Sequence, residues 1–367
     1  MIKYLKLIVK LLRSILLGAN VVSILLMLLC GLTSYFHPDG VLVHSAIFSL
    51  AFPFFVFINL AFLFLSLIFY IRYVWVPFIG LILGFGMIRT YCPFNIPNPH
   101  PKGCIKVMSY NVAGFSLDTY RQKKDSNCVD LLNYLKQSGA DVLCLQEYNF
   151  TKGKSVDKIE ETMGHWRYFD TVQLGGTNVL ALCSNYRILR KEKIPTGFDG
   201  HGSAAFYLEV DKDTIVIINN HLVSNVISAD DKKVYKDMVM TPDSVNIKSN
   251  LLYFSEKIGQ AAQKRALQSD SIVYYIKGVK HPVIVCGDLN DSPMSYVHRN
   301  LTKDLQDAYV ASGQGPGISY HESGMFFRLD NILCSKDWVS YDAGVDNTIA
   351  ASDHYPIFVY LKLNKSK

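Results

Sequence analysis

The first 100 residues of this 367-residue chain are almost free of charge. Between Arg13 and Arg89, only Asp39 and Arg72 are charged. Three long apolar segments fill this region, at about residues 14–36, 45–71 and 74–91. A cleaved signal peptide would be shorter and would stand alone, and a soluble helical domain of this composition would have nothing polar to face water. Residues 1–91 are therefore predicted to form a transmembrane anchor of about three helices.

The rest of the chain lacks a strong excess of positive charge. Residues 1–100 hold six basic residues and one acidic residue, which leaves 31 basic and 30 acidic residues for positions 101–367. Proteins that bind nucleic acid nonspecifically need clustered Lys and Arg to displace counterions from phosphates. This near-neutral region argues against that class and favours a smaller phosphoester or a lipid.

The sequence also lacks paired cysteines and internal repeats. None of the eight cysteines forms a C-x-x-C pair, so a zinc knuckle is not expected. A disulfide between Cys92 and Cys104 stays open at this stage. The remaining expectation is that the cysteines in apolar runs are buried free thiols, namely Cys144, Cys183, Cys286 and Cys334.

The distribution of Lys and Arg predicts the orientation of the anchor. Lys3, Lys6, Lys10 and Arg13 precede the first apolar segment, the loop after it has no Lys or Arg, and Arg72 follows the second. The N-terminus and Arg72 are then cytoplasmic. Three full spans would place the remaining chain outside the cytoplasm, whereas a re-entrant third segment would leave it inside; we favour three spans. Residues 92–101, rich in proline, are expected to form a stiff linker to a domain at 102–367.

From residue 105 onward, short β-like runs alternate with loops and two helical stretches. The helices are predicted at about 128–138 and 247–276. The strands are rich in Val, Ile, Leu, Phe or Tyr and are predicted at 105–110, 142–146, 179–184, 204–210, 215–219, 282–286, 328–334 and 357–363. The segment 224–269 is highly charged, and we expect a helical excursion that shapes access to a site.

Several predicted strands end in, or begin with, polar residues that can do chemistry. Strand ends that converge on one edge of a sheet are a common way to build a site. The motifs are Asn111, Gln146-Glu147, His221-Leu222, Gly287-Asp288-Leu289-Asn290, Arg328-Leu329-Asp330 and Ser352-Asp353-His354.

Each motif alone has an ordinary structural explanation. A salt bridge would account for Glu147 or Asp330, an Asx turn for Asp288 and Asn290, and a satisfied structural role for His221. The other histidines, including His201, lack such settings and are taken as structural or solvated. The ordered set of six motifs in one domain is what indicates a hydrolytic site.

Taken together, these motifs resemble the endonuclease/exonuclease/phosphatase family, which includes DNase I-like enzymes. The resemblance covers about residues 107–363 and implies a four-layer α/β sandwich, with two packed mixed β-sheets flanked by helices. It also implies hydrolysis of a phosphoester with Mg²⁺ or Mn²⁺ as cofactor. His221 departs from the apurinic endonucleases, which carry tyrosine there, and Asn331 stands where many bacterial members have tyrosine.

The resemblance implies a role for each matched residue. Glu147 corresponds to the main metal ligand, Asn111 lies beside it, and Asp353 is a further ligand. His354 corresponds to a general base or phosphate-contacting histidine that Asp330 orients. Asp288 and Asn290 correspond to the pair that positions the nucleophile and stabilises the pentavalent phosphorus. His221 corresponds to the second histidine, although its glutamate partner is not identifiable in the sequence.

The sequence thus predicts a multi-pass membrane protein whose extracytoplasmic domain is a metal-dependent phosphodiesterase or phosphatase, acting on lipid-derived or small phosphoesters. The first alternative is a nuclease on the same side of the membrane. The second is a membrane-bound interaction domain on an inactive hydrolase scaffold, which the complete set of polar positions disfavours.

Overall fold

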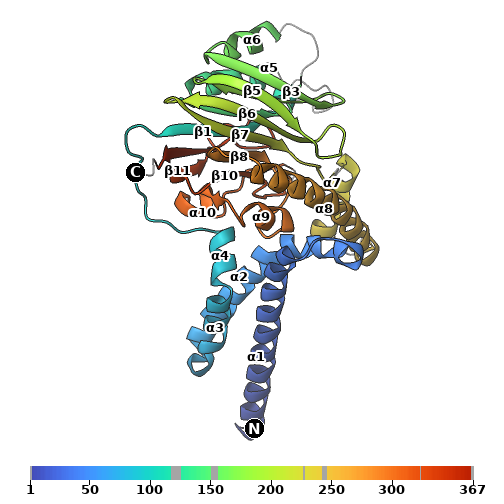
Figure 1. Cartoon of the computed structure of the whole chain (residues 1–367). Helices are drawn as coiled ribbons and strands as arrows, with labels where there is room; N and C mark the ends of the chain where they lie inside the picture. The colour runs from blue at the N-terminus through green and yellow to red at the C-terminus, as the bar shows by residue number, and fades with distance from the viewer. Residues whose placement is uncertain are drawn as a thin grey trace.

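The computed structural model describes residues 2–116, 125–149, 156–225, 228–241, 246–322 and 324–364. A β-sandwich with flanking helices stands on a narrower group of N-terminal helices, and the N-terminus lies at the end farthest from the sandwich (Figure 1). Parts of the 224–269 segment, at 226–227 and 242–245, lie outside the described residues.

Two six-stranded mixed sheets form the centre of the sandwich. The first has the strand order β11-β12-β1-β2-β4-β3 and the second β5-β6-β7-β8-β10-β9. The strands of the first sheet are β1 Ile105–Asn111, β2 Val142–Gln146, β3 Tyr168–Gly175, β4 Asn178–Ser184, β11 Trp338–Val345 and β12 Ile357–Leu363. Those of the second are β5 Arg187–Ile194, β6 Gly202–Val210, β7 Asp213–His221, β8 Val283–Asp288, β9 Gln306–Asp307 and β10 Asp330–Cys334.

Alternation along the central strands gives each sheet two apolar faces. On β1, Val107 faces the other sheet, while Met108 and Tyr110 face outward. On β8, Ile284 points between the sheets and Val285 points outward. Because successive side chains of a strand point to opposite faces, strands buried on both sides read as continuous apolar runs.

Helices cover both outer faces. Helices α5 Asp125–Gln137 and α6 Val156–Met163 pack on the first sheet. Helices α8 Ile247–Lys277 and α9 Tyr296–Leu301 pack on the second. The expected four-layer α/β sandwich is confirmed. The remaining helices of the sandwich region are α7 Ala229–Met240, α10 Ala308–Ser312 and the short turn η4 Ala113–Ser116.

The N-terminal region contains two helices that are long and apolar enough to cross a membrane, α1 Ile2–Leu32 and α2 Ala46–Phe69. The third apolar segment is not one straight helix. It consists of α3 Trp75–Leu83 and α4 Phe85–Tyr91, bent by 60° at the break, and it passes the same test only as a pair. The turns η1 Thr33–Tyr35, η2 Gly40–Ser45 and η3 Ile71–Tyr73 connect these helices.

Small and polar side chains allow the N-terminal helices to pack closely. A Cβ on Gly80 would lie 2.5 Å from Ile24, and one on Gly31 would lie 2.1 Å from the Met87 sulfur. Asn59 also joins α2 to α1, because its amide donates to Ser23 Oγ at 3.0 Å and its Oδ1 accepts from Asn20 at 3.2 Å. Close approach at small residues and hydrogen bonds between helices are how helices associate in a bilayer.

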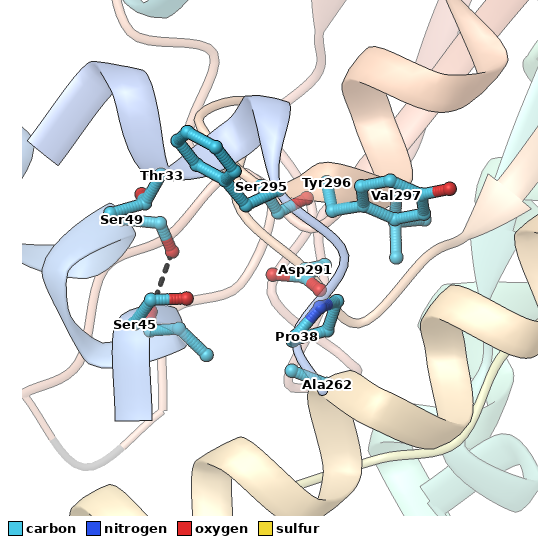
Figure 2. Close-up of a pocket in the computed structure, with 11 residues that line it drawn as sticks. Thr33, Pro38, Ser45, Ser49, Ala262, Asp291, Ser295, Tyr296 and Val297 are labelled. Carbon is cyan, nitrogen blue, oxygen red and sulfur yellow. Dashed lines mark hydrogen bonds between the residues drawn. The ribbon is translucent and has the colours of Figure 1, made fainter. Parts of the chain in front are cut away.

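The connection between α1 and α2 packs against the sandwich. Figure 2 shows Thr33, Pro38 and Ser45 of this connection facing Tyr296 and Ala262 of the sandwich helices. The guanidinium of Arg299 lies 3.2 Å from the ring centroid of Tyr35, and Gln263 donates to Asp39 at 3.0 Å. A buried apolar cluster extends the contact, with Met294 of the sandwich beside Met27, Cys30 and Phe52 of the helices.

The structure contains strands that the sequence patterns did not predict, namely β3, β5, β9 and β11. β5 and β3 are edge strands with many exposed polar residues, so their apolar alternation is weak. The Cys92 and Cys104 thiols are both free, and the four cysteines expected in the interior are buried and free.

Candidate functional site

Strand register brings the predicted polar residues to one edge of the sandwich. In the first sheet, β1 and β2 run parallel, so Asn111 pairs with Gln146 and Glu147 follows directly. In the second sheet, Asp288 at the end of β8 pairs with His221 of β7 and with Asp330 of β10. The start of β12, after Asp353 and His354, lies beside the end of β1 because those strands are antiparallel.

Asp288 lies at the centre of this group. Its Oδ2 accepts hydrogen bonds from the amides of Asn111 and Asn290, each at 3.1 Å. The same oxygen lies 3.7 Å from His354 Nε2 and 4.0 Å from His221 Nε2. Burial is the main cause that raises the pKa of Asp288, and the carboxylate of Asp330 acts in the same direction.

The turn after β8 depends on two unusual backbone positions. Gly287 has φ +127°, and a Cβ there would lie 2.1 Å from the Asn220 carbonyl oxygen on the neighbouring strand. Asn290 has φ +52°, which asparagine tolerates better than most residues. The Asn290 amide donates to Leu222 O at 3.0 Å, and its backbone N–H donates to Asp288 Oδ1 at 2.8 Å. These bonds fix the Asn290 amide beside Asp288.

Glu147 and Asn111 face Asp288 from the other sheet. Asn111 Nδ2 donates to Glu147 Oε1 at 3.1 Å, while Asn111 Oδ1 accepts from the Ala113 N–H at 3.0 Å. Asn111 therefore links the Glu147 and Asp288 carboxylates and limits how far they move. Glu147 has φ +50°, a strained backbone for a non-glycine residue, and its side chain stays 30% exposed to the cavity.

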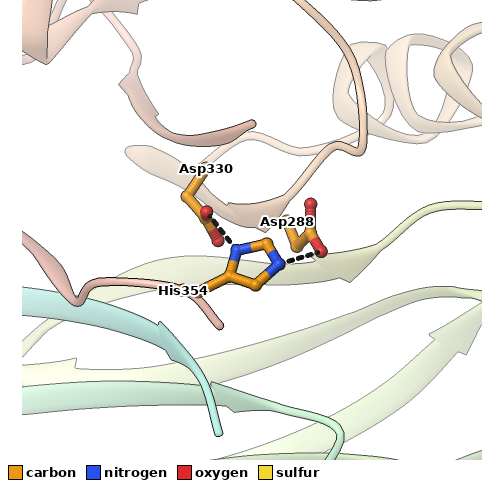
Figure 3. Close-up of side chains that lie close together, drawn as sticks. All are labelled: Asp288, Asp330 and His354. Carbon is orange, nitrogen blue, oxygen red and sulfur yellow. Dashed lines mark hydrogen bonds and ion pairs between the residues drawn. The ribbon is translucent and has the colours of Figure 1, made fainter. Parts of the chain in front are cut away.

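His354 lies between two carboxylates (Figure 3). Its Nδ1 is 2.7 Å from Asp330 Oδ2, and its Nε2 points toward Asp288. Burial alone would lower the pKa of His354, but Asp330 and Asp288 together raise it to about 10. The imidazole is therefore a cation at neutral pH, suited to contact a phosphoryl oxygen.

The arrangement of Asp288, Asp330 and His354 could suggest a metal site, since their ligand atoms lie within 4.8 Å of one another. A protonated imidazole has no lone pair for a metal, however, and Asp330 already engages Nδ1. The group is better described as a histidine held by two carboxylates.

His221 occupies the opposite side of Asp288. Its Nε2 lies 3.5 Å from Glu147 Oε1, and its Nδ1 is buried without a hydrogen-bond partner among the described residues. The ring of His201 lies edge-on at 4.9 Å between centroids. Burial, followed by the charge of His221, lowers the pKa of His201 to about 4, so His201 is neutral near pH 7.

Other buried polar groups support the site from beneath. Gln146 Nε2 donates to Asn219 Oδ1 at 2.6 Å, and Asn219 Nδ2 donates to Leu145 O at 3.1 Å, which joins the two sheets below the polar edge. Ser352 Oγ donates to the Asn111 carbonyl at 2.7 Å and lies 3.3 Å from Asp353 Oδ1. Asp353 is thereby held beside the end of β1.

The donor set fits a hard divalent cation. Asn111 links Glu147 to Asp288, and Asp288 and Asp330 lie on the two sides of His354. The ion-pair partners of these three carboxylates within the described parts of the chain are His221 and His354 alone. One oxygen, Asp330 Oδ1, is buried and has no hydrogen-bond partner among the described residues. Carboxylate and amide oxygens are the ligands that Mg²⁺ prefers. Glu147 is the most accessible of the three carboxylates, so the cation would bind on its side of Asp288.

A cavity of about 510 Å³ opens above these residues. Its polar end is formed by Glu147, His221, Asp288, Asn290, Asp353 and His354. Its other walls are mainly apolar and come from α7, α8, the residues Tyr320, Met325, Phe327 and Leu329 and, unexpectedly, the first turns of α2, at Ala46, Ile47, Leu50 and Ala51. The polar side chains of Ser224, Asn225, Arg265 and Asp291 also line it.

All eight residues that the sequence predicted for the site lie at this edge, while their individual roles stay predictions. Sequence reasoning missed His201 and the contribution of α2. His201 could have been found from the β6–β7 hairpin. Counting residue pairs outward from the turn at Asp211 and Lys212 places Gly202 opposite His221, and His201 directly precedes Gly202. No local signal marks α2, because its contact with the site arises only when the helices dock on the sandwich.

Several solved structures share this fold. The catalytic domain of human Nocturnin with bound sulfate matches at a TM-score of 0.52, with 17% identity over 71% of this chain and 94% of that one. A functionally unknown conserved protein from Enterococcus faecalis matches at 0.51, with 14% identity over 71% and 100%. Humanized D. rerio TDP2 matches at 0.50, with 16% identity over 71% and 99%.

Comparison with curated proteins gives no match. A family model described only as a domain of unknown function matches residues 13–91. The model of the endonuclease/exonuclease/phosphatase family, whose members are phosphoesterases, matches residues 108–354 and thus spans every strand end described above. The chain therefore belongs to the endonuclease/exonuclease/phosphatase family.

Proposed function

We propose that this protein is a membrane-anchored, divalent-metal-dependent hydrolase of phosphoesters. The observation that carries the proposal is the convergence on Asp288 of two amides and two histidines, with Glu147 held beside it by Asn111. Membership of a phosphoesterase family supports the reaction class.

Glu147 would hold Mg²⁺ or Mn²⁺, with Asp353 and Asn111 as further ligands or as supports for ligands. When bound, such an ion polarises a phosphoryl oxygen and neutralises charge that develops during attack on phosphorus. The excess of carboxylates over cationic partners at this edge is the feature that fits the ion.

The side chains around Asp288 can orient the attacking water, stabilise charge on the phosphoryl group and protonate the leaving group. Asp288 is an oxygen acceptor at the centre of the site and can orient an attacking water. Asn290, fixed by Leu222 O, can donate a hydrogen bond to a non-bridging oxygen as charge accumulates there. His354, held as a cation by Asp330, contacts the phosphoryl group. His221, on the far side of Asp288, is placed to give a proton to the leaving group.

The anchor is part of the proposal. We infer three crossings, by α1, α2 and the bent pair α3–α4, which Figure 1 draws running between the sandwich and the distal end that carries the N-terminus. Lys3, Lys10 and Arg13 near the N-terminus and Arg72 after α2 then lie on the cytoplasmic side. The hydrolase domain faces the extracytoplasmic side, as does the connection between α1 and α2 that packs on it.

The test uses the full chain, purified in detergent. We expect hydrolysis of bis-p-nitrophenyl phosphate that requires Mg²⁺ or Mn²⁺, and its loss in Glu147→Ala and His354→Ala. No turnover above those two variants, on either this diester or p-nitrophenyl phosphate, would refute the proposal. Efficient nicking of plasmid DNA with negligible activity on small phosphoesters would instead favour an extracytoplasmic nuclease.

A further inference from the structure

The cavity above Asp288 joins the polar edge of the sandwich to the anchor. Its lining includes the site residues at one end and Leu50 of α2 with Phe254 and Ile258 of α8 at the other. α2 belongs to an apolar stretch, Gly40–Phe69, that is long enough to cross a membrane. One continuous cavity therefore connects a phosphate-binding group of residues with a helix whose other faces suit lipid.

The docking of α2 beside the site is held by specific contacts. Met294, six residues beyond Asp288, is 4% exposed and packs with Met27 and Phe52 in the buried cluster of the helices. Close in sequence to the cavity-lining residues of α2 and α8, His44 lies 3.0 Å from Ser255 Oγ, and a Cβ on Gly259 would lie 2.4 Å from the Val43 carbonyl oxygen. These contacts hold the α2 wall of the cavity in place beside the site.

Exposed apolar side chains also lie on the connection between α1 and α2 and on α8. Val41 is 89% exposed in the connection between α1 and α2, and Leu252 is 60% exposed on α8. Leu251, which lines the cavity, is 48% exposed. Exposed apolar residues next to a membrane helix fit contact with the surface of a bilayer.

The charges in the cavity do not suit a polynucleotide. Within the described lining, Arg265 is the one Lys or Arg side chain, and its Nε already pairs with Asp291 at 3.0 Å. A nucleic acid strand would need several free cationic groups along its backbone. A substrate with one phosphoester and an apolar chain matches the cavity from end to end.

We infer that the substrate is an amphiphilic phosphoester taken from the adjoining leaflet, with its phosphate at Asp288 and its hydrocarbon chain between α2 and α8. This inference rests on the proposed function and specifies the substrate class of that same site. The anchor then does more than tether the domain, because α2 supplies one wall of the substrate site.

The first test compares two diesters that share a leaving group, p-nitrophenyl methyl phosphate and p-nitrophenyl dodecyl phosphate, with the full chain in lipid nanodiscs and Mn²⁺. We expect kcat/KM for the dodecyl ester to be at least about tenfold higher, because burying even a few methylene groups has that effect. If neither ester is hydrolysed, the proposed function fails. If both are hydrolysed equally well, only the inference about the substrate fails.

Variants separate binding in the cavity from simple partition of the dodecyl ester into the bilayer. Leu50→Trp and Leu251→Trp should lower the dodecyl-to-methyl ratio of kcat/KM at least about fivefold by filling the cavity. Leu67→Trp on α2 and Leu267→Trp on α8 are matched controls, since both residues are exposed and neither lines the cavity. An unchanged ratio in both cavity variants, or an equal fall in the controls, would overturn the inference.

A second measurement does not depend on turnover. Dodecyl phosphate with a diazirine at the end of its chain is photolysed with the full chain in nanodiscs and EDTA, and labelled peptides are identified by mass spectrometry. We expect labelling to concentrate in residues 46–51 and 251–258 and to fall in Leu50→Trp. Labelling spread evenly over the lipid-facing surfaces of α1, α2 and α3 would refute the proposed path.

Discussion

Asp330 Oδ2 lies 2.7 Å from His354 Nδ1, on the side of the imidazole opposite Asp288. Asp330 is held in turn by Ser319, whose hydroxyl accepts the Asp330 backbone N–H at 3.1 Å. The register of β10 against β8 places Asp330 opposite Asp288, so the two carboxylates bracket the ring. The position and charge of His354 thus follow from strand pairing rather than from a flexible loop.

Replacing Asp330 with asparagine should remove the charge that keeps His354 protonated. We expect the pKa of His354 to fall from its raised value of about 10, and kcat on an aryl phosphodiester to fall about 10²–10⁴-fold. Histidine NMR titration and steady-state kinetics measure the two effects. Asp213→Asn, an exposed position at the opposite end of β7, is the control; wild-type kinetics and pKa in Asp330→Asn would contradict the assignment.

Metal binding should be measurable without turnover. A divalent cation that binds only the folded protein stabilises it by about 2.7 kcal/mol at 100 times its dissociation constant. We expect Mg²⁺ or Mn²⁺ to raise the melting temperature, and EDTA to reverse the rise and abolish activity. Glu147→Gln should raise the metal concentration needed for this stabilisation at least about tenfold, because even residues that only support metal ligands contribute about 10–100-fold to affinity.

Glu209→Gln serves as the comparison for Glu147→Gln, because Glu209 is an exposed carboxylate on β6 away from the site. Glu147 would be excluded as a ligand if neither cation changed the melting temperature of the wild type. It would also be excluded if the cations raised the melting temperature of Glu147→Gln as much as that of the wild type.

The sequence was sufficient for the central strands and for the set of polar residues that meet at one edge of the sandwich. Strands such as β1 and β8 carry continuous apolar runs that end in polar residues, and their parallel neighbours force those ends together. The helix from Ile247 to Lys277 was also predictable from its periodicity. Each apolar run and the polar residues at its end are close together in the chain, which is why local patterns sufficed to find them.

Features that depend on distant packing were not predictable. The edge strand β5 carries mainly exposed polar residues, so its sequence lacks the alternation of apolar and polar residues that predicts a strand. The wall that α2 contributes to the cavity depends on Met294 entering the helical cluster, a contact between segments more than 200 residues apart. His201 has no motif of its own and reaches His221 only through the β6–β7 pairing.

Asp307 should make the stability of the protein sensitive to acid. Burial would raise the pKa of Asp307, but Arg328 at 3.2 Å and His298 at 2.8 Å hold it below its usual range. The carboxylate therefore contributes stability above about pH 4, and this contribution is lost as the pH falls through the lowered pKa. Arg328 also donates to Thr90 O at 3.0 Å, which ties the end of α4 to the same group.

Asp307→Asn should cost about 3 kcal/mol near pH 7, because it leaves a buried guanidinium without its charged partner. The difference in melting temperature from the wild type should shrink as the pH is lowered toward 3. Thermal unfolding of the full chain in detergent across this pH range measures it. Asp304→Asn, an exposed position nearby, should behave as wild type; a difference that stays constant with pH would contradict the role of the charge.

Gly287 should be the backbone position on which the geometry of Asp288 depends most. Its φ of +127° is a conformation that side chains rarely adopt, and the added methyl group of Gly287→Ala would lie 2.1 Å from the Asn220 carbonyl oxygen. Because that contact is between paired strands, neither strand can shift without moving His221 or Asp288. We expect Gly287→Ala to destabilise the fold by at least about 3 kcal/mol and to lower kcat in any folded fraction.

Gly278→Ala is the matched control, since its φ is −83° and the nearest atom to an added Cβ is 3.4 Å away. A Gly287→Ala protein with wild-type melting temperature and kcat would show that the strand ends do not set the positions of the catalytic side chains.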